Sequence, residues 1–220
     1  GKNALVNDAG IGQVLLMSKE ALTRRVLANS DIDVYPCGRL DIQSGQVDRR
    51  VLATLEFLVA SGLKPTVTSL RCGHSYYTSS GNVSEHTTGT AMDIGAINGI
   101  VITPATQGPG SITDLTIQRL LKLQGTMKPH QIISLMTFED TDNTFAMGDH
   151  ADHIHVGFQP LFGPNEKLGK QALAVLEPGQ WSDLISRLGE IDNPVVPTAA
   201  SKYSLPATKD RRASSAHAGE

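Results

Sequence analysis

Histidines gather in two short stretches of this sequence. Three of the seven lie within "HADHIH" (150–155), and His86 stands seven positions ahead of Asp93 in a run of small residues. Asp93 itself lies in the apolar segment "AMDIGAI" (91–97), where a carboxylate is costly unless a cation or a metal ion faces it. Two imidazoles and one carboxylate are a common ligand set of catalytic zinc, with the fourth position left to water. The residue types therefore predict a metal site.

Strand geometry brings two of the imidazoles together. Side chains alternate between the faces of a strand, so His153 and His155 of "DHIHVGF" point the same way while Ile154 and Val156 face the other side. Gly89 gives the backbone freedom to fold His86 toward Asp93. The alternative is a surface histidine in a loop and an aspartate that only accepts hydrogen bonds, because short histidine motifs also occur without a metal.

A longer pattern gives the site a family resemblance. The stretch S-x-H-x-x-G-x-A-x-D, from Ser84 to Asp93, is followed by D-x-x-H, from Asp152 to His155, with His153 completing H-x-H. This pattern resembles the zinc D-alanyl-D-alanine carboxypeptidases and D,D-dipeptidases, which share a metal fold with lysostaphin-type endopeptidases and the hedgehog signalling domain. The likeness runs from about residue 67 to residue 158. It implies a small α+β domain whose central antiparallel sheet holds zinc.

The resemblance also implies roles for individual residues. His86, Asp93 and His155 would be the zinc ligands, and Asp152 would be the general base, in a position where many relatives have Glu. His153 would lie beside the metal and support catalysis.

Two further residues match family positions that contact substrate. Arg71 of "SLRCGHS" would bind substrate and stabilise the developing oxyanion, although Leu70 replaces the usual aromatic residue before it. Ser84 would support the site and contact the carboxylate of the substrate.

Three other polar residues lie close to these motifs in the sequence. His74 follows Gly73 in the loop after Arg71. Its side chain could lie on the surface or face the cleft, and the sequence does not decide between the two. We expect His150 to be an exposed turn residue, and Asp149 either to form a turn or to orient an imidazole.

The elements that must position these residues can be read from periodicity. Residues 18–28 predict a helix capped by Ser18, and "QVDRRVLATLEFLVASGL" (46–63) predicts a longer one, with Ser44 just ahead and Gly62 at its end. "PTVTSL" (65–70) predicts a strand, and residues 71–90 a long loop of the kind that carries function.

The second half of the domain predicts more strands. "AMDIGAI" and "GIVIT" should form a hairpin around Asn98-Gly99, followed by a helix in "DLTIQRLLKLQG" (114–125) and strands in "HQIISLMTF" (130–138) and "DHIHVGF". We predict an α+β domain with a central, mostly antiparallel sheet and helices packed mainly on one side.

The chain divides into three predicted parts. Residues 1–160 form the zinc peptidase domain, 161–191 a short helical extension that contains Trp181, and 192–220 a flexible tail or linker rich in Pro, Ser and Ala. No signal peptide precedes the domain, so we expect the chain to be a piece of a larger parent protein.

The composition argues against a nucleic-acid-binding protein and against a membrane-spanning one. The net charge of -3 gives no basic field for nucleic acid, and no apolar run reaches the ~20 residues of a membrane span. Two cysteines, Cys37 and Cys72, are too few for a structural zinc knuckle. The sequence allows them either to form a disulfide or to remain two separate thiols.

The expected function follows from the resemblance: zinc-dependent hydrolysis of peptide bonds in the stems of bacterial peptidoglycan, at a bond involving D-alanine, outside the cell or in its envelope. Carboxypeptidase, dipeptidase and endopeptidase activity all stay open. The alternatives are a non-catalytic zinc-containing binding module on the same fold, or another zinc hydrolase such as an amidase.

Overall fold

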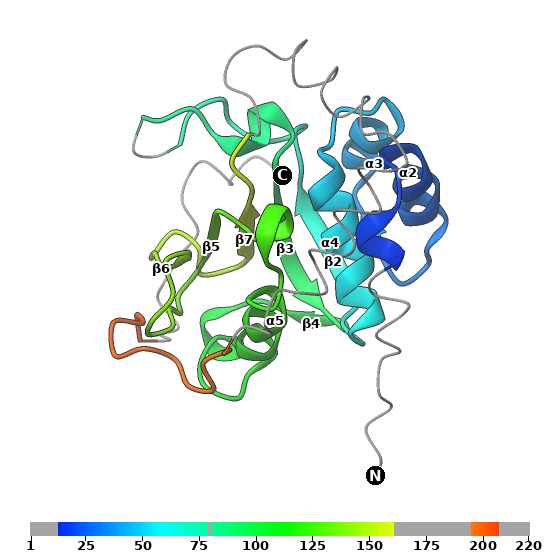
Figure 1. Cartoon of the computed structure of the whole chain (residues 1–220). Coiled ribbons are helices and arrows are strands. Elements are labelled where there is room, and N and C mark those ends of the chain that lie inside the picture. The colour runs from blue at the N-terminus through cyan, green and yellow to red at the C-terminus, as the bar shows by residue number, and fades with distance from the viewer. Residues whose placement is uncertain (1–12, 79–80, 161–194, 207–220) are drawn as a thin grey trace.

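The computed structural model describes residues 13–78, 81–160 and 195–206 of the 220-residue chain. In this part the fold is mixed α/β: a seven-stranded sheet with helices packed against it (Figure 1). The α-helices are α2 (Lys19–Ala28), α3 (Pro36–Gln43), α4 (Arg49–Ala60) and α5 (Ile112–Leu120). The strands are β1 (Asp33–Val34), β2 (Pro65–Ser69), β3 (Ala91–Ile97), β4 (Ile100–Val101), β5 (Gln131–Ser134), β6 (Thr144–Ala146) and β7 (Ile154–Gly157). Three short 3₁₀ helices are η1 (Glu85–Thr88), η2 (Pro104–Thr106) and η3 (Gly125–Met127).

The two predicted N-terminal helices are confirmed. Ser18 caps α2 by accepting a hydrogen bond from the amide of Ala21, which satisfies one of the unpaired N–H groups of the first turn. In α4 the cap is Asp48, whose side chain accepts from the amide of Arg50, so the helix starts later than its apolar pattern suggests. Most of α4 is buried, and it contacts α2, β2 and α5 (Figure 1).

Helix α3 is absent from the prediction. It is only eight residues long and contains Gly38, a weak helix former, so its local signal is slight. Pro36 at its first turn suits a helix start, because the missing N–H is not needed there. Ser44, expected ahead of α4, instead ends α3.

The sheet is mostly antiparallel, as predicted, but two of its strand pairs are parallel. Its order is β1-β2-β3-β7-β5-β6, with β4 paired to β3. Strands β2, β3, β7 and β5 pair antiparallel, whereas β1 joins β2 and β6 joins β5 in parallel. The sheet is therefore mixed, with parallel strands added at both edges. The parallel strand β6 is absent from the prediction, because its three residues show no alternation long enough to detect.

Strand β3 lies at the centre of the sheet and has two different faces. Met92 and Ile94 belong to the hydrophobic core together with Ile154 and Val156 of β7. Because alternate residues share a face, Asp93 points to the opposite side of the sheet from this core. The predicted hairpin between β3 and β4 is confirmed, since Asn98 and Gly99 both have positive φ angles of 54° and 76°.

Residues 195–206 lie beside the segment that follows β5. The amide of Ser201 donates to the carbonyl of Thr137, and that of Leu205 donates to the carbonyl of Leu135. These contacts hold part of the predicted tail against the segment after β5. The predicted helical extension at 161–191, with Trp181, lies outside the described residues. Within the described residues, no helix combines the length and the apolar character that crossing a membrane requires.

Candidate metal centre

Strand register brings Asp93 and His155 side by side. Asp93 of β3 pairs directly with His155 of β7, and His155 in turn pairs with Ile133 of β5. Both polar side chains are almost fully buried, with 1% of Asp93 and 6% of His155 exposed. The carboxylate Oδ1 of Asp93 lies 2.9 Å from Nδ1 of His155. The two predicted ligands from distant motifs therefore meet in the middle of the sheet.

His86 enters the cluster from η1, just before β3. Ser84 caps this turn by accepting from the amide of His86, and Gly89 ends it in the left-handed conformation. A Cβ atom on Gly89 would lie 1.9 Å from the carbonyl oxygen of Gln46, so only glycine fits here. The imidazole of His86 is fully buried, and its Nδ1 donates to the carbonyl of Leu70 at 2.6 Å. This bond leaves Nε2 as the nitrogen that faces the cluster.

The three predicted ligand atoms lie at the spacing that a tetrahedral metal requires. Nε2 of His86 is 3.3 Å from Oδ1 of Asp93 and 3.2 Å from Nδ1 of His155. Zinc bonds of about 2.0–2.1 Å place adjacent tetrahedral ligand atoms about 3.3 Å apart. The two distances from His86 match this spacing, whereas the 2.9 Å between Asp93 and His155 is shorter, so a small outward shift of these two groups would let the three atoms hold one zinc-sized cation.

The proton arrangement also fits a cation. Nδ1 of His86 gives its proton to a carbonyl, so its Nε2 atom meets the Asp93 carboxylate either with a second proton, as a hydrogen-bond donor, or with a lone pair. A lone pair and a carboxylate oxygen at 3.3 Å repel one another unless a proton or a metal ion lies between them. The donor set is therefore the kind that a cation stabilises.

The pKa values of the buried pair favour the forms that ligate a metal. Burial alone would raise the pKa of Asp93, but the charges of His86 and His153 and the hydrogen bonds from His155 and His86 hold it well below its usual value. Burial lowers the pKa of His155 to about 3, outweighing the opposing effect of Asp93. Asp93 is thus ionised and His155 neutral at neutral pH, as coordination requires.

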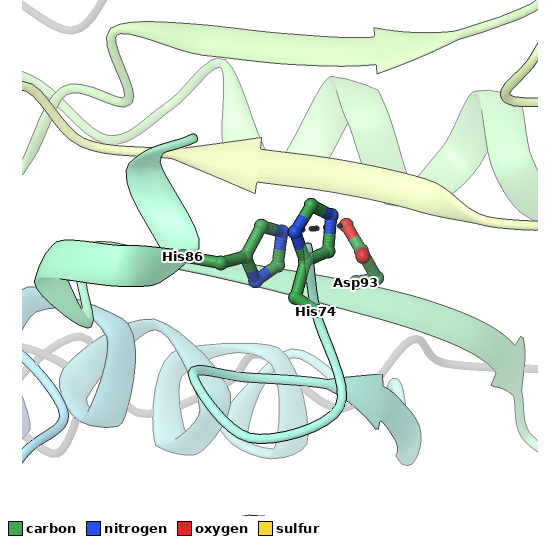
Figure 2. Close-up of side chains that lie close together, drawn as sticks. All are labelled: His74, His86 and Asp93. Carbon is green, nitrogen blue, oxygen red and sulfur yellow. Dashed lines mark ion pairs between the residues drawn. The ribbon is translucent and has the colours of Figure 1, made fainter. Parts of the chain in front are cut away.

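His74 joins this cluster from the loop after β2. One ligand atom each from His74, His86 and Asp93 lie within 4.8 Å of one another, and Figure 2 shows the three side chains pointing toward one another. The rings of His74 and His86 stack with centroids 3.9 Å apart and planes 9° apart. Of the two positions that the sequence left open for His74, the structure shows the one inside the site.

His153 and Asp152 form a pair next to the ligand atoms. Nδ1 of His153 lies 2.7 Å from Oδ1 of Asp152, and Nε2 of His153 lies 3.9 Å from Oδ1 of Asp93. His153 is buried, whereas 53% of the Asp152 side chain is exposed. Burial alone would lower the pKa of His153, but Asp93 and then Asp152 raise it above its ordinary value. The predicted convergence of His153 and His155 is confirmed, because both approach the same carboxylate.

His150 corrects the prediction of an exposed turn residue. Only 7% of it is exposed, and its ring packs 4.6 Å from that of His153 and 5.8 Å from that of His155, measured between centroids. Asp149 does orient an imidazole, since its Oδ1 lies 2.8 Å from Nδ1 of His150. The burial of His150 could not be predicted from the sequence, because the turn before β7 is polar. In the folded protein this turn packs against β7, where the ring of His150 contacts that of His155.

Arg71 and Ser84 occupy different positions relative to the ligands. The guanidinium of Arg71 is exposed and hydrogen-bonds to the side-chain oxygen of Gln46. Ser84 is 2% exposed, and its Oγ lies 3.3 Å from Nδ1 of His74 as well as accepting from the amide of His86. Ser84 therefore supports two imidazoles of the cluster. The predicted contacts of both residues with substrate stay predictions.

A chain of polar side chains lies behind His155. The side-chain amide of Gln131 is 3.2 Å from Nε2 of His155 and donates to Glu85 at 3.1 Å, and Glu85 pairs with the half-exposed His130. An amide nitrogen can only donate, so Nε2 of His155 accepts this bond and the ring proton lies on Nδ1, toward Asp93. For Nδ1 to bind a cation, the proton must move to Nε2 and the Gln131 amide must turn its oxygen toward that atom. Sequence reasoning missed Gln131 because nothing in its local pattern indicates which strand will lie beside β7.

The two cysteines form a disulfide between Cys37 and Cys72. It joins the first turn of α3 to the loop that carries Arg71 and His74. The sequence left this pairing open. Tyr35 adds a second contact to the same loop, because its hydroxyl accepts from the amide of Leu70 at 2.8 Å and also contacts the carbonyl of Cys72.

Comparison with family models, with curated proteins and with solved structures finds no significant match for this chain. The candidate site therefore has to be interpreted from its own geometry.

Proposed function

We propose that this protein is a metal-dependent peptidase, and specifically a zinc enzyme that cuts the peptide stems of bacterial peptidoglycan at a bond involving D-alanine. One observation carries the proposal: Nε2 of His86, Oδ1 of Asp93 and Nδ1 of His155, from two motifs about sixty residues apart, stand 2.9–3.3 Å from one another in a buried cluster. The substrate class comes from the resemblance of the two motifs to D-alanyl-D-alanine peptidases, which implies an extracellular or cell-envelope location.

His86, Asp93 and His155 would hold the zinc ion. When bound there, zinc would supply a water molecule of lowered pKa and an electrophilic centre for the substrate carbonyl. The remaining chemistry belongs to side chains of the protein. No nucleophilic side chain is required for it.

His153 and Asp152 provide the group that moves a proton. Their side chains hydrogen-bond at 2.7 Å, and Nε2 of His153 stands closest to the ligand atoms, 3.9 Å from Asp93. We assign the pair as one acid–base unit, with the half-exposed carboxylate of Asp152 open to the substrate side. It would accept the proton of the attacking water and pass it to the leaving amine.

Arg71 would assist from the loop beside the site. Its exposed guanidinium is held by a neutral partner, Gln46, so a substrate carboxylate or a developing oxyanion could compete for it. A binding module that carries a metal without hydrolysis has no need of either Arg71 or the acid–base pair.

Metal content and hydrolysis, measured on the same preparations, test the proposal. The wild-type chain, His86→Ala and His155→Ala are purified, and zinc is quantified by mass spectrometry. Each is then assayed on a stem peptide ending in D-Ala-D-Ala and on the same peptide ending in L-Ala-L-Ala. His217→Ala is the matched control, because it removes an imidazole that belongs to neither motif.

We expect one zinc per wild-type and control chain, cleavage of the D-alanine peptide only, and loss of both properties in His86→Ala and His155→Ala. A wild-type chain that binds no metal would refute the metal centre. Zinc without cleavage of either peptide or of intact peptidoglycan would refute the peptidase and leave a metal-containing binding module.

A further inference from the structure

His74 lies beside the three proposed ligands but is not one of them. It lies in residues 71–78, after the end of β2, and a ligand atom of His74 lies within 4.8 Å of ligand atoms of His86 and Asp93 (Figure 2). It is partly buried and stacks on His86. An imidazole at this distance from two candidate ligands can also ligate the same cation.

The hydrogen bonds of His74 select the nitrogen that would do so. Nδ1 lies 2.9 Å from the carbonyl oxygen of Ser75, and a carbonyl can only accept, so Nδ1 carries the proton of the neutral ring. The Nε2 atom therefore carries the lone pair. This arrangement, in which one nitrogen donates to a carbonyl and the other is available to a metal, is the usual one for ligating histidines. His86 has the same arrangement through Leu70.

The stacking shows that coordination by His74 requires a movement. A metal lies near the plane of each imidazole that binds it, and two parallel rings 3.9 Å apart cannot share one metal in both planes. His74 must tilt away from the stack to bring its Nε2 to the spacing of about 3.3 Å expected between ligands. Gly73, with a φ of +86°, lies directly before His74 and supplies backbone freedom at that point.

We propose that His74 is an exchangeable fourth ligand of the metal centre formed by His86, Asp93 and His155. With His74 bound, the centre would have four protein ligands and be closed; with His74 stacked on His86, the arrangement seen in this structure, a fourth position would be left to water and substrate. The inference rests on the proposed metal centre. It adds that residues 71–78, the described part of the loop that carries His74, control access to that centre.

Counting the imidazoles on the metal tests this inference without relying on activity. Zinc-loaded wild-type protein, His74→Ala and His153→Ala are compared by X-ray absorption spectroscopy, and their zinc dissociation constants are measured by chelator competition. His153→Ala is the matched control, because it removes the other imidazole beside the three ligands. Far-UV circular dichroism checks that each variant is folded, and His74→Gln repeats the measurement with a polar side chain.

We expect three imidazoles per zinc in the wild-type protein and in His153→Ala but two in His74→Ala and His74→Gln. The dissociation constant should rise by about tenfold or more in both His74 variants, since even loss of a contact behind a ligand costs about 10–100-fold. In cobalt-substituted His74→Ala, added imidazole should restore the visible absorption of the wild-type protein.

Two imidazoles in wild-type protein, with an unchanged dissociation constant in His74→Ala, would overturn the role of His74 and leave the three-ligand centre intact. A wild-type chain that binds no zinc would instead overturn the metal centre itself. The two failures are therefore distinguishable.

Discussion

Replacing Gly89 with alanine should destabilise the protein far more than the same change at another left-handed glycine. Gly89 has a φ of +71°, which costs an L-residue about 1–2 kcal/mol. Its Cβ would also lie 1.9 Å from the carbonyl oxygen of Gln46 and 3.0 Å from the carbonyl carbon. These atoms belong to the backbone, so a rotamer change cannot relieve the clash.

Gly99 supplies a matched control for the backbone conformation. Its φ is +76°, and a Cβ there would meet no atom within 4 Å. Gly99→Ala should therefore cost about 1 kcal/mol, the left-handed penalty less a gain from the stiffer unfolded chain. Gly89→Ala should cost about 1–3 kcal/mol more, the usual range for forcing extra atoms into a packed site.

Urea unfolding of the metal-free protein gives both free energies. Zinc affinity should fall in Gly89→Ala alone, because Gly89 ends the turn that carries His86 and its carbonyl accepts from the amide of Asp48 at 2.8 Å. Equal losses of stability in the two variants, with unchanged zinc affinity in both, would show that the contact with Gln46 does not fix the position of His86.

Two further predictions concern pH and the disulfide. Burial lowers the pKa of His155 to about 3, so below about pH 6.5 the unfolded chain binds a proton at this residue that the folded state does not. The free energy of unfolding is therefore highest above about pH 6.5 and decreases as the pH falls toward the folded pKa. Between about pH 7 and about pH 4.5, metal-free wild-type protein should lose up to about 2 kcal/mol more than His155→Gln in urea unfolding, and parallel losses would contradict this account. Replacing Cys37 and Cys72 with serine should cost about 2–4 kcal/mol in the same assay; an unchanged midpoint would show that the bond does not restrain the loop carrying His74.

The sequence was sufficient wherever the signal is local. The helices around residues 19–28 and 49–60 follow from apolar periodicity, and the β3–β4 hairpin follows from Asn98-Gly99. His86 and Asp93 could be paired because a fixed motif of small residues joins them, and strand alternation put His153 and His155 on one face. These predictions depend on residues within a few positions of one another, whose backbone geometry is set by their own types.

The tertiary structure decided what depends on contacts between distant parts of the chain. Strand β6 and helix α3 are too short to show a period, and the parallel edges of the sheet arise only when distant segments pair. The burial of His150, the contact of Gln131 with His155 and the stacking of His74 on His86 have no local signature, because each is fixed by packing and hydrogen bonds across the fold. The motifs indicated which residues could bind a metal, and the register of β3 against β7 determined that their ligand atoms meet.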